Sequence, residues 1–403
     1  MYLSPNLDKT QMMVYSAIVY VAWGMIYTVG DVSFWGLPNV MTPNSEERSS
    51  VISISKIFNS IGSAVPEVLF LVVGFIIAAW VENSPEAIDP LTVQKRKYLL
   101  MAIITVGLGS ILYSRVCTGV SERVKIPAKK RQPGEPSQLT RIFKCKPLVL
   151  VLLMGVLSSG RYMIGAAAIH VARYSFYIGP ELAGLSEAAR TAAIEQSVSS
   201  VKTIFQIGSI VGLFGATLFM PKLMKKFDYK KLVIVSCLAG FCASLVTTLV
   251  GWFTMNLYAC IPFVIIACIP LGVINTVCFA MICDCLDYME PTTGFHDNAL
   301  GAACQGFINK IGNAFATSGI VITYMLMDID PAKMLSATNV VAATDVDTSI
   351  RFAMFALVSI VPGVSMLLCS IPMFFYDIAG DKKKKMLDEL ASKRKEVGVI
   401  VES

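Results

Sequence analysis

Residues 23–56 read WGMIYTVGDVSFWGLPNVMTPNSEERSSVISISK and place an acid, Asp31, and a lysine, Lys56, in two apolar segments joined by a short polar loop. Residues 284–310, DCLDYMEPTTGFHDNALGAACQGFINK, repeat this arrangement with Asp287 and Lys310. The lysine follows the acid by 25 residues in the first stretch and by 23 in the second. A charge in lipid costs at least about 2.5 kcal/mol, so such residues usually face a partner or a water-filled path. The two stretches therefore predict two related helix pairs that face one cavity.

The composition indicates an all-α polytopic membrane protein. Of the 403 residues, 55% are hydrophobic and only 15% are charged, which is too apolar for one soluble domain. Apolar runs long enough to cross about 30 Å of hydrocarbon as helices recur along the chain. Nine spans are expected, at residues 12–38, 51–80, 98–114, 147–177, 197–220, 231–252, 257–283, 299–327 and 350–376.

The distribution of basic residues predicts the domain organisation and the orientation. Lysines and arginines gather in segment 115–146 and in the tail 377–403, which the positive-inside rule places in the cytoplasm. Three spans within 1–114 and six within 147–376 then form two bundles. Counting back from the central loop puts residue 1 outside, with no cleavable signal before it. The net charge of +6 follows from this topology and indicates no nucleic-acid partner.

An aromatic stripe surrounds the first acid. Trp23, Tyr27, Asp31 and Trp35 are spaced by four residues, so they follow one flank of a helix. Aromatic rings offer an apolar surface to the C–H face of a pyranose, and a carboxylate accepts hydrogen bonds from two hydroxyls. The pattern favours a sugar site. The alternative is that both tryptophans belong to the interfacial aromatic belt and that Tyr27 only packs.

The two lysines of these stretches differ in how else their positions can be explained. Lys56 lies early in its span, where it neutralises Asp31, hydrogen-bonds a substrate, or extends to the cytoplasmic interface. Lys310 lies far inside its span and is difficult to place at an interface. Both are therefore candidate substrate-binding residues.

Acids gather at the end of the span 257–283. Asp284 and Asp287 are three residues apart and share a helical face, with Glu290 one turn further on. Three interpretations stay open: a proton or sodium site, a solvated helix end, or a contact with a basic loop of the neighbouring bundle.

The sequence contains no pattern that indicates an enzyme, a cofactor or a structural metal. Most of the eleven cysteines lie within predicted spans, where they act as small apolar residues. Only two histidines are present. No cysteine or serine has a histidine nearby in the pattern of a nucleophile and base, and no phosphate-binding glycine loop occurs.

Three stretches resemble one known family. They are WGMIYTVGDVSFWGLPNVMTPNSEER at 23–48, DCLDYMEPTTG with FINKIGNAFA within 284–316, and FKCKPLVLVLL after the basic loop. All three are similar to the glycoside-pentoside-hexuronide:cation symporters, and the likeness covers essentially the entire chain. It implies a major-facilitator fold of two six-helix bundles that give alternating access to a central sugar site.

The resemblance also implies residue roles. Tyr27, Asp31 and Trp35 match the family's sugar contacts, and Lys56 stands where relatives have an arginine. Gln305 and Lys310 match residues of the eleventh helix. Asp284 and Asp287 match the acids of the tenth helix. Together with Glu290 and His296, they are the candidate gating or inter-bundle residues. His296 follows the loop glycine where relatives have an arginine, so this gate is expected to be weakened or pH-sensitive.

The resemblance begins just before the family's fourth helix. The nine spans would then be helices 4–12 of twelve, and 1–114 would be an incomplete, N-terminally truncated bundle. In the family the absent unit supplies paired acids that bind the cation, so a cation site made from Asp31 alone would be incomplete.

These observations predict a function and a location. The chain is expected to be a multi-pass cell-membrane transporter that imports a sugar or glycoside with sodium or a proton, and to be monomeric if complete. The alternative is a truncated fragment without transport activity, or a subunit that needs a separate three-helix unit.

Overall fold

A computed structural model describes residues 8–42, 44–82, 90–121, 123–125, 137–185, 187–293, 298–329, 343–396 and 400–401. These residues are almost entirely helical. The exception is one short antiparallel ladder, in which β1 (Val124–Lys125) pairs with β2 (Ile400–Val401). The prediction of an all-α chain is confirmed.

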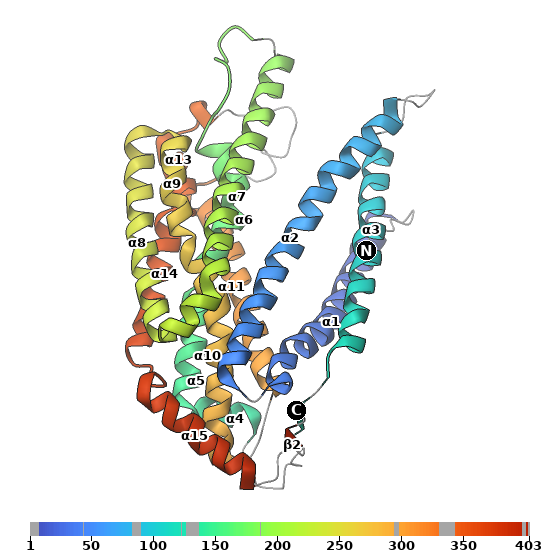
Figure 1. Cartoon of the computed structure of the whole chain (residues 1–403). Helices are drawn as coiled ribbons and strands as arrows, with labels where there is room; N and C mark the ends of the chain where they lie inside the picture. The colour runs from blue at the N-terminus through green and yellow to red at the C-terminus, as the bar shows by residue number, and fades with distance from the viewer. Residues whose placement is uncertain are drawn as a thin grey trace.

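Three long helices form the N-terminal body. They are α1 (Lys9–Met41), α2 (Ser45–Glu82) and α3 (Pro90–Gly119), and each covers one predicted span. The helix α2 contacts both α1 and α3. In Figure 1, α2 lies between α3 and the rest of the molecule, while α1 also packs directly against α11.

The remaining helices form the C-terminal body and the tail. They are α4 (Gln138–Lys144), α5 (Lys146–Leu157), α6 (Gly160–Tyr174), α7 (Glu187–Lys226), α8 (Tyr229–Thr254), α9 (Leu257–Ala267), α10 (Ile269–Thr293), α11 (Asn298–Leu326), α13 (Thr348–Ala356), α14 (Ile360–Phe374) and α15 (Gly380–Glu396), with a short 3₁₀ turn at Ala343–Asp345. Three predicted spans, 147–177, 257–283 and 350–376, are each broken into two helices.

The break between α5 and α6 is stabilised by a side chain of α14. The hydroxyl of Ser365 accepts a hydrogen bond from the N–H of Gly160 at 2.9 Å and donates one to the carbonyl of Leu157 at 2.5 Å. Backbone groups freed by the break are thus satisfied inside the protein, as lipid requires. A Cβ at position 160 would lie 2.5 Å from the Cβ of Ser365, so this approach requires glycine.

The chain is a multi-pass membrane protein. Among the described residues, seven helical segments are long and apolar enough to cross a membrane: Thr10–Pro38, Tyr98–Val116, Lys146–Tyr174, Gln196–Lys226, Tyr229–Thr254, Leu257–Glu290 and Thr348–Phe374. The predicted spans 51–80 and 299–327 coincide with α2 and α11, which are not among the seven. The number nine therefore stays a prediction.

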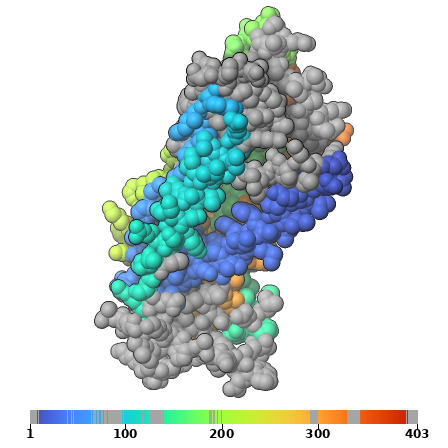
Figure 2. All heavy atoms as spheres, turned by 90° about the vertical axis from the view of Figure 1, so that its right-hand side faces the viewer, coloured from blue at the N-terminus to red at the C-terminus, as the bar shows by residue number. Residues whose placement is uncertain are grey.

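The two bodies approach each other at the end of the molecule where α10 meets α15, and they diverge toward the opposite end (Figure 1). Contacts between the bodies come from α1 with α11 and from α2 with α7 and α10. Figure 2 shows α1 and α3 along one outer face. No residue of their most apolar windows is buried, whereas half of that window is buried in Lys146–Tyr174.

Candidate functional site

A cavity of about 720 Å³ lies between the two bodies and collects the predicted polar residues. One wall comes from α1 and α2, and the other from α6, α10 and α11. Its lining includes five of the six predicted substrate-binding residues, namely Tyr27, Asp31, Trp35, Lys56 and Lys310. Residues from both repeated acid-and-lysine stretches therefore line the same space.

Trp35 separates the acid and the lysine of the first helix pair. Its indole Nε1 donates a hydrogen bond to Asp31 Oδ1 at 3.0 Å, and Lys56 Nζ lies 3.9 Å from the centre of its ring. Within the described chain, no ion pair joins Asp31 and Lys56. Instead Lys56 donates to Asn275 Oδ1 of α10 at 3.4 Å. Both charges thus face the cavity rather than cancel in direct contact.

Lys56 is buried, with only 3% of its surface exposed. It does not extend to the membrane interface, because its ammonium contacts Trp35 and Asn275. The ammonium over the indole face is a cation–π contact, which is strongest where water is excluded.

The opposite wall carries a chain of amide and hydroxyl groups. Arg161 donates to the Tyr162 hydroxyl at 2.8 Å, and Tyr162 donates to Asn309 Oδ1 at 2.8 Å. Gln305 donates to the same Asn309 oxygen at 3.0 Å. Gln305 is buried and is not among the cavity-lining residues, so it reaches the cavity through Asn309.

Lys310 and Tyr27 lie on the more open part of the cavity. Lys310 Nζ donates to Thr28 Oγ1 at 3.1 Å, which links α11 to α1 across the space. Tyr27 is 54% exposed, and its ring stacks on Trp23 with centroids 5.5 Å apart. Trp23 itself is not a lining residue. The aromatic stripe therefore continues from the cavity to the protein surface.

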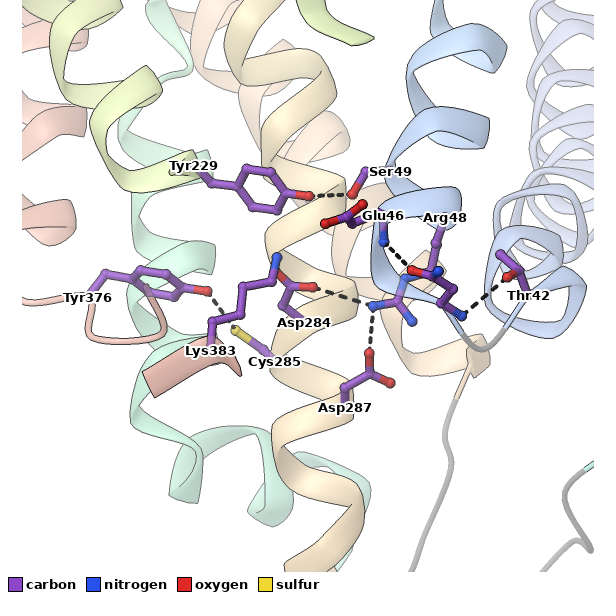
Figure 3. Close-up of polar contacts among 11 residues, drawn as sticks. Thr42, Glu46, Arg48, Ser49, Tyr229, Asp284, Cys285, Asp287, Tyr376 and Lys383 are labelled. Carbon is purple, nitrogen blue, oxygen red and sulfur yellow. Dashed lines mark hydrogen bonds and ion pairs between the residues drawn. The ribbon is translucent and has the colours of Figure 1, made fainter. Parts of the chain in front are cut away.

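A second polar cluster joins the two bodies where α2 meets α10 (Figure 3). Arg48 of α2 contacts Asp287 Oδ2 at 2.5 Å and Asp284 Oδ1 at 3.4 Å. All three side chains are at least 96% buried. Burial disfavours the charge of Arg48, but the two carboxylates outweigh this effect and hold the pKa of its guanidinium above the usual value.

The tail helix completes this cluster. Lys383 of α15 contacts Asp284 Oδ2 at 2.6 Å, and its ammonium lies 4.1 Å from the centre of the Tyr229 ring. Burial lowers the pKa of Lys383, but Asp284 and Tyr229 together outweigh burial and hold this pKa above the usual value. The Tyr229 hydroxyl in turn shares a hydrogen bond with Ser49 of α2. Three helices from separate parts of the chain therefore meet at two acids.

The structure says less about the other two predicted gating residues, Glu290 and His296. Glu290 lies one turn beyond Asp287 on α10 and is half-buried. His296 falls outside the described residues.

Sequence reasoning did not select Arg48 or Lys383 as site residues. Arg48 lies in the first turn of α2, where the helix dipole disfavours a cation. A cation at this position therefore indicates that an anionic partner lies nearby. Lys383 gave no such signal, because it is one of four consecutive lysines in the tail.

The fold and the cavity between two helical bodies define the class of polytopic membrane transporters. The family model described as MFS/sugar transport protein matches residues 1–178 and 193–380. The chain belongs to this family, and the resemblance to cation symporters of sugars within the major facilitator superfamily is confirmed. The family is one of transporters and not of enzymes.

Curated relatives agree with this assignment. An uncharacterized symporter, YjmB, of Bacillus subtilis (strain 168) is 24% identical over 370 residues, which are 88% of this chain and 71% of the relative. A glucuronide carrier protein homolog of Escherichia coli (strain K12) is 21% identical, covering 95% of this chain and 74% of the relative. A lactose permease of Lactobacillus delbrueckii subsp. bulgaricus is 23% identical, and the match covers 93% of this chain and 54% of the relative.

Proposed function

We propose that the chain is a secondary active transporter that moves a sugar or glycoside together with sodium or a proton by alternating access. The observation that carries this proposal is the meeting of Asp31, Trp35 and Lys56 at a cavity lined by both bodies. A site between two bodies is the arrangement that rocking transporters use.

The cavity has the chemistry of a sugar site. Its volume of about 720 Å³ falls in the range of small-molecule pockets, which is roughly 300–1,000 Å³. The rings of Tyr27 and Trp35 suit the C–H face of a pyranose. Asp31, Lys56 and Asn309 supply an acceptor, a donor and an amide for hydroxyl groups.

Asp31 supports coupling to a cation. Its carboxylate lines the cavity and has no lysine or arginine within ion-pair distance among the described residues. A bound cation would screen this charge and favour the arrangement that holds the sugar, so each ligand would raise the affinity for the other. Sodium and a proton both satisfy this argument.

The cluster around Asp284 and Asp287 is proposed as the gate on the cytoplasmic side. It joins α2 to α10 and to the basic tail helix α15, which the positive-inside rule assigns to the cytoplasm. Closure at this end and divergence at the other correspond to an outward-facing state.

Uptake into liposomes tests the proposal. The purified full chain is reconstituted, a sodium or proton gradient is imposed, and accumulation of labelled lactose, raffinose and a glucuronide is measured. These sugars are the ones named in relatives, a lactose permease, a raffinose carrier and a glucuronide carrier homolog. We expect one of them to accumulate, and Asp31→Asn to abolish gradient-driven accumulation.

The matched control is Ser33→Ala on the same helix, because within the described part of the chain the hydroxyl of Ser33 bonds only to the carbonyl of Val29 in its own helix. It should transport like the unsubstituted chain. The proposal is wrong if no sugar accumulates under either gradient, or if Asp31→Asn accumulates sugar normally.

A second candidate is that this chain is one part of a larger transporter. The apolar windows of α1 and α3 have no buried residue, which suits further helices packed against them as well as lipid. Accumulation of sugar by the chain alone rejects this candidate. Uptake that requires a co-expressed three-helix unit supports it.

A further inference from the structure

A second pocket lies outside the sugar cavity, at the end of the molecule that carries the tail helix. Its volume is about 310 Å³, and it is formed by α2, the junction of α7 and α8, and α15. Five lysines line it, namely Lys225, Lys226, Lys231, Lys383 and Lys384. The acids in the lining are Glu46 and Asp228.

Lysines outnumber carboxylates five to two in the lining of this pocket. Lys383 is paired with Asp284. Among the described residues, the other four lysines have no carboxylate within ion-pair distance. Asp228 Oδ1 accepts a hydrogen bond from the N–H of Gly380 at 3.3 Å, a neutral donor that does not offset the carboxylate charge. The pocket therefore presents an excess of ammonium groups to whatever enters it.

The position of the pocket relative to the membrane suits a phosphate group. The helix α7 ends at Lys226 and α8 begins at Tyr229, just beyond the predicted spans 197–220 and 231–252. Basic pockets at this level of a membrane protein bind anionic head groups. The hydroxyls of Ser49, Ser50 and Tyr229 lie on the same wall, where Ser50 donates to the carbonyl of Glu46 and the other two share a hydrogen bond.

We propose that this lysine-lined pocket binds a phosphate group, either of an anionic phospholipid or of a free phosphate compound. Its walls belong to both bodies, with α2 on one side and α7, α8 and α15 on the other. The ligand contacts all of them only while the two bodies are apposed at this end. It therefore stabilises the arrangement in which Arg48 pairs with Asp284 and Asp287.

Thermal unfolding of the full chain in detergent tests the pocket. The probes are short-chain phosphatidylglycerol, short-chain phosphatidylcholine as the zwitterionic comparison, and inorganic phosphate. We expect a saturable rise in Tm with an anionic probe. Protection by phosphatidylglycerol alone identifies a lipid head group as the ligand. Equal protection by inorganic phosphate identifies a free phosphate compound.

Two double variants separate the pocket from general surface charge. Lys225→Gln with Lys384→Gln removes two lining lysines from α7 and α15. Lys222→Gln with Lys385→Gln removes two lysines from the same helices outside the lining. At about 1 kcal/mol for each lysine, the pocket variant should need roughly thirty-fold more probe, and the control should match the unsubstituted chain.

Each result of these Tm measurements either supports or overturns the proposed phosphate site. The proposal is overturned if no anionic probe raises Tm, or if both double variants lose protection equally. If the pocket variant does not fold, the single change Lys231→Gln replaces it, with an expected loss of roughly five-fold in apparent affinity. An unchanged affinity in that variant also overturns the proposal.

Discussion

At the scale of single residues, Trp35 organises the polar wall of the cavity between the two bodies. It is 8% exposed, and its ring packs edge-on against Phe279 at 5.3 Å between centroids. The indole N–H faces Asp31, and the indole face carries Lys56. One side chain therefore fixes the positions of two opposite charges without letting them neutralise each other.

The buried ammonium of Lys56 should contribute to substrate affinity. A hydrogen bond to a charged group contributes about 1.5–3 kcal/mol, so Lys56→Gln should raise the KM for sugar uptake by roughly ten-fold or more. Lys56→Arg keeps the charge and should recover part of the loss. The control is Lys202→Gln on the exposed side of α7, and an unchanged KM in Lys56→Gln would contradict this role.

Five of the six predicted binding residues line the cavity, and their binding role stays a prediction. They could be selected from sequence because an ionisable residue in a membrane span usually faces a partner or a water-filled path. The aromatic residues are spaced along the same helix flank as Asp31. Gln305 was selected by resemblance alone, and it lies behind Asn309. Arg48 was missed because its partners, Asp284 and Asp287, lie more than 230 residues away in the chain. Long-range ion pairs of this kind leave no local pattern.

At the scale of helices, the breaks in the predicted spans are of two kinds, and only one of them has a cause that the local sequence shows. The break after Leu157 depends on Ser365, whose position cannot be inferred from the segment 147–177 itself. The break at Cys268 is different, since Pro270 follows two residues later and proline interrupts helices locally. Only the second kind of break has a local cause.

The close approach of α6 and α14 should not tolerate a side chain at position 160. In Gly160→Ala the new methyl would overlap Ser365 and Pro362, and such overpacking costs about 1–3 kcal/mol. Tm in detergent should therefore fall. Gly165→Ala on the same helix has nothing within 4 Å of the new Cβ and should leave Tm unchanged or raise it slightly. Equal behaviour of the two variants would refute the argument.

The junction of α2 and α10 should depend on Arg48. Arg48→Gln leaves Asp284 and Asp287 buried without this cation, and breaking a buried ion pair costs about 3–5 kcal/mol. Arg190→Gln is the matched control, because its ion pair with Asp345 has both side chains 45% exposed and should contribute less than about 1 kcal/mol. Thermal unfolding in detergent compares the two variants. A smaller effect at Arg48 than at Arg190 would refute the assignment.

At the scale of the whole molecule, the two ends should differ in access to water. Asn313→Cys lies in the exposed part of the cavity between the two bodies, and Ser50→Cys lies at the end where the bodies meet. An impermeant thiol reagent should modify Asn313→Cys from outside intact cells and Ser50→Cys only in inverted vesicles. The unsubstituted chain gives the background, and transported sugar should protect Asn313→Cys. The reverse pattern would overturn the proposed orientation.

The overall architecture was largely predictable because helical membrane spans need long apolar runs. Every predicted span coincides with one helix or with two consecutive helices. The angle between the two bodies was not predictable, since it depends on a few contacts between distant segments, such as Arg48 with Asp287 and Lys310 with Thr28.

Because Trp35 donates a hydrogen bond to Asp31, the fluorescence of this tryptophan can report on the site. Indole fluorescence responds to the charge next to its N–H. Trp35 is more buried than the other three tryptophans, since Trp23 and Trp252 are each 52% exposed and Trp80 is half-buried. Binding of a coupling cation at Asp31 should therefore shift the emission of this one fluorophore. Titration with sodium or acid would then report occupancy directly, and Trp35→Phe should remove the signal.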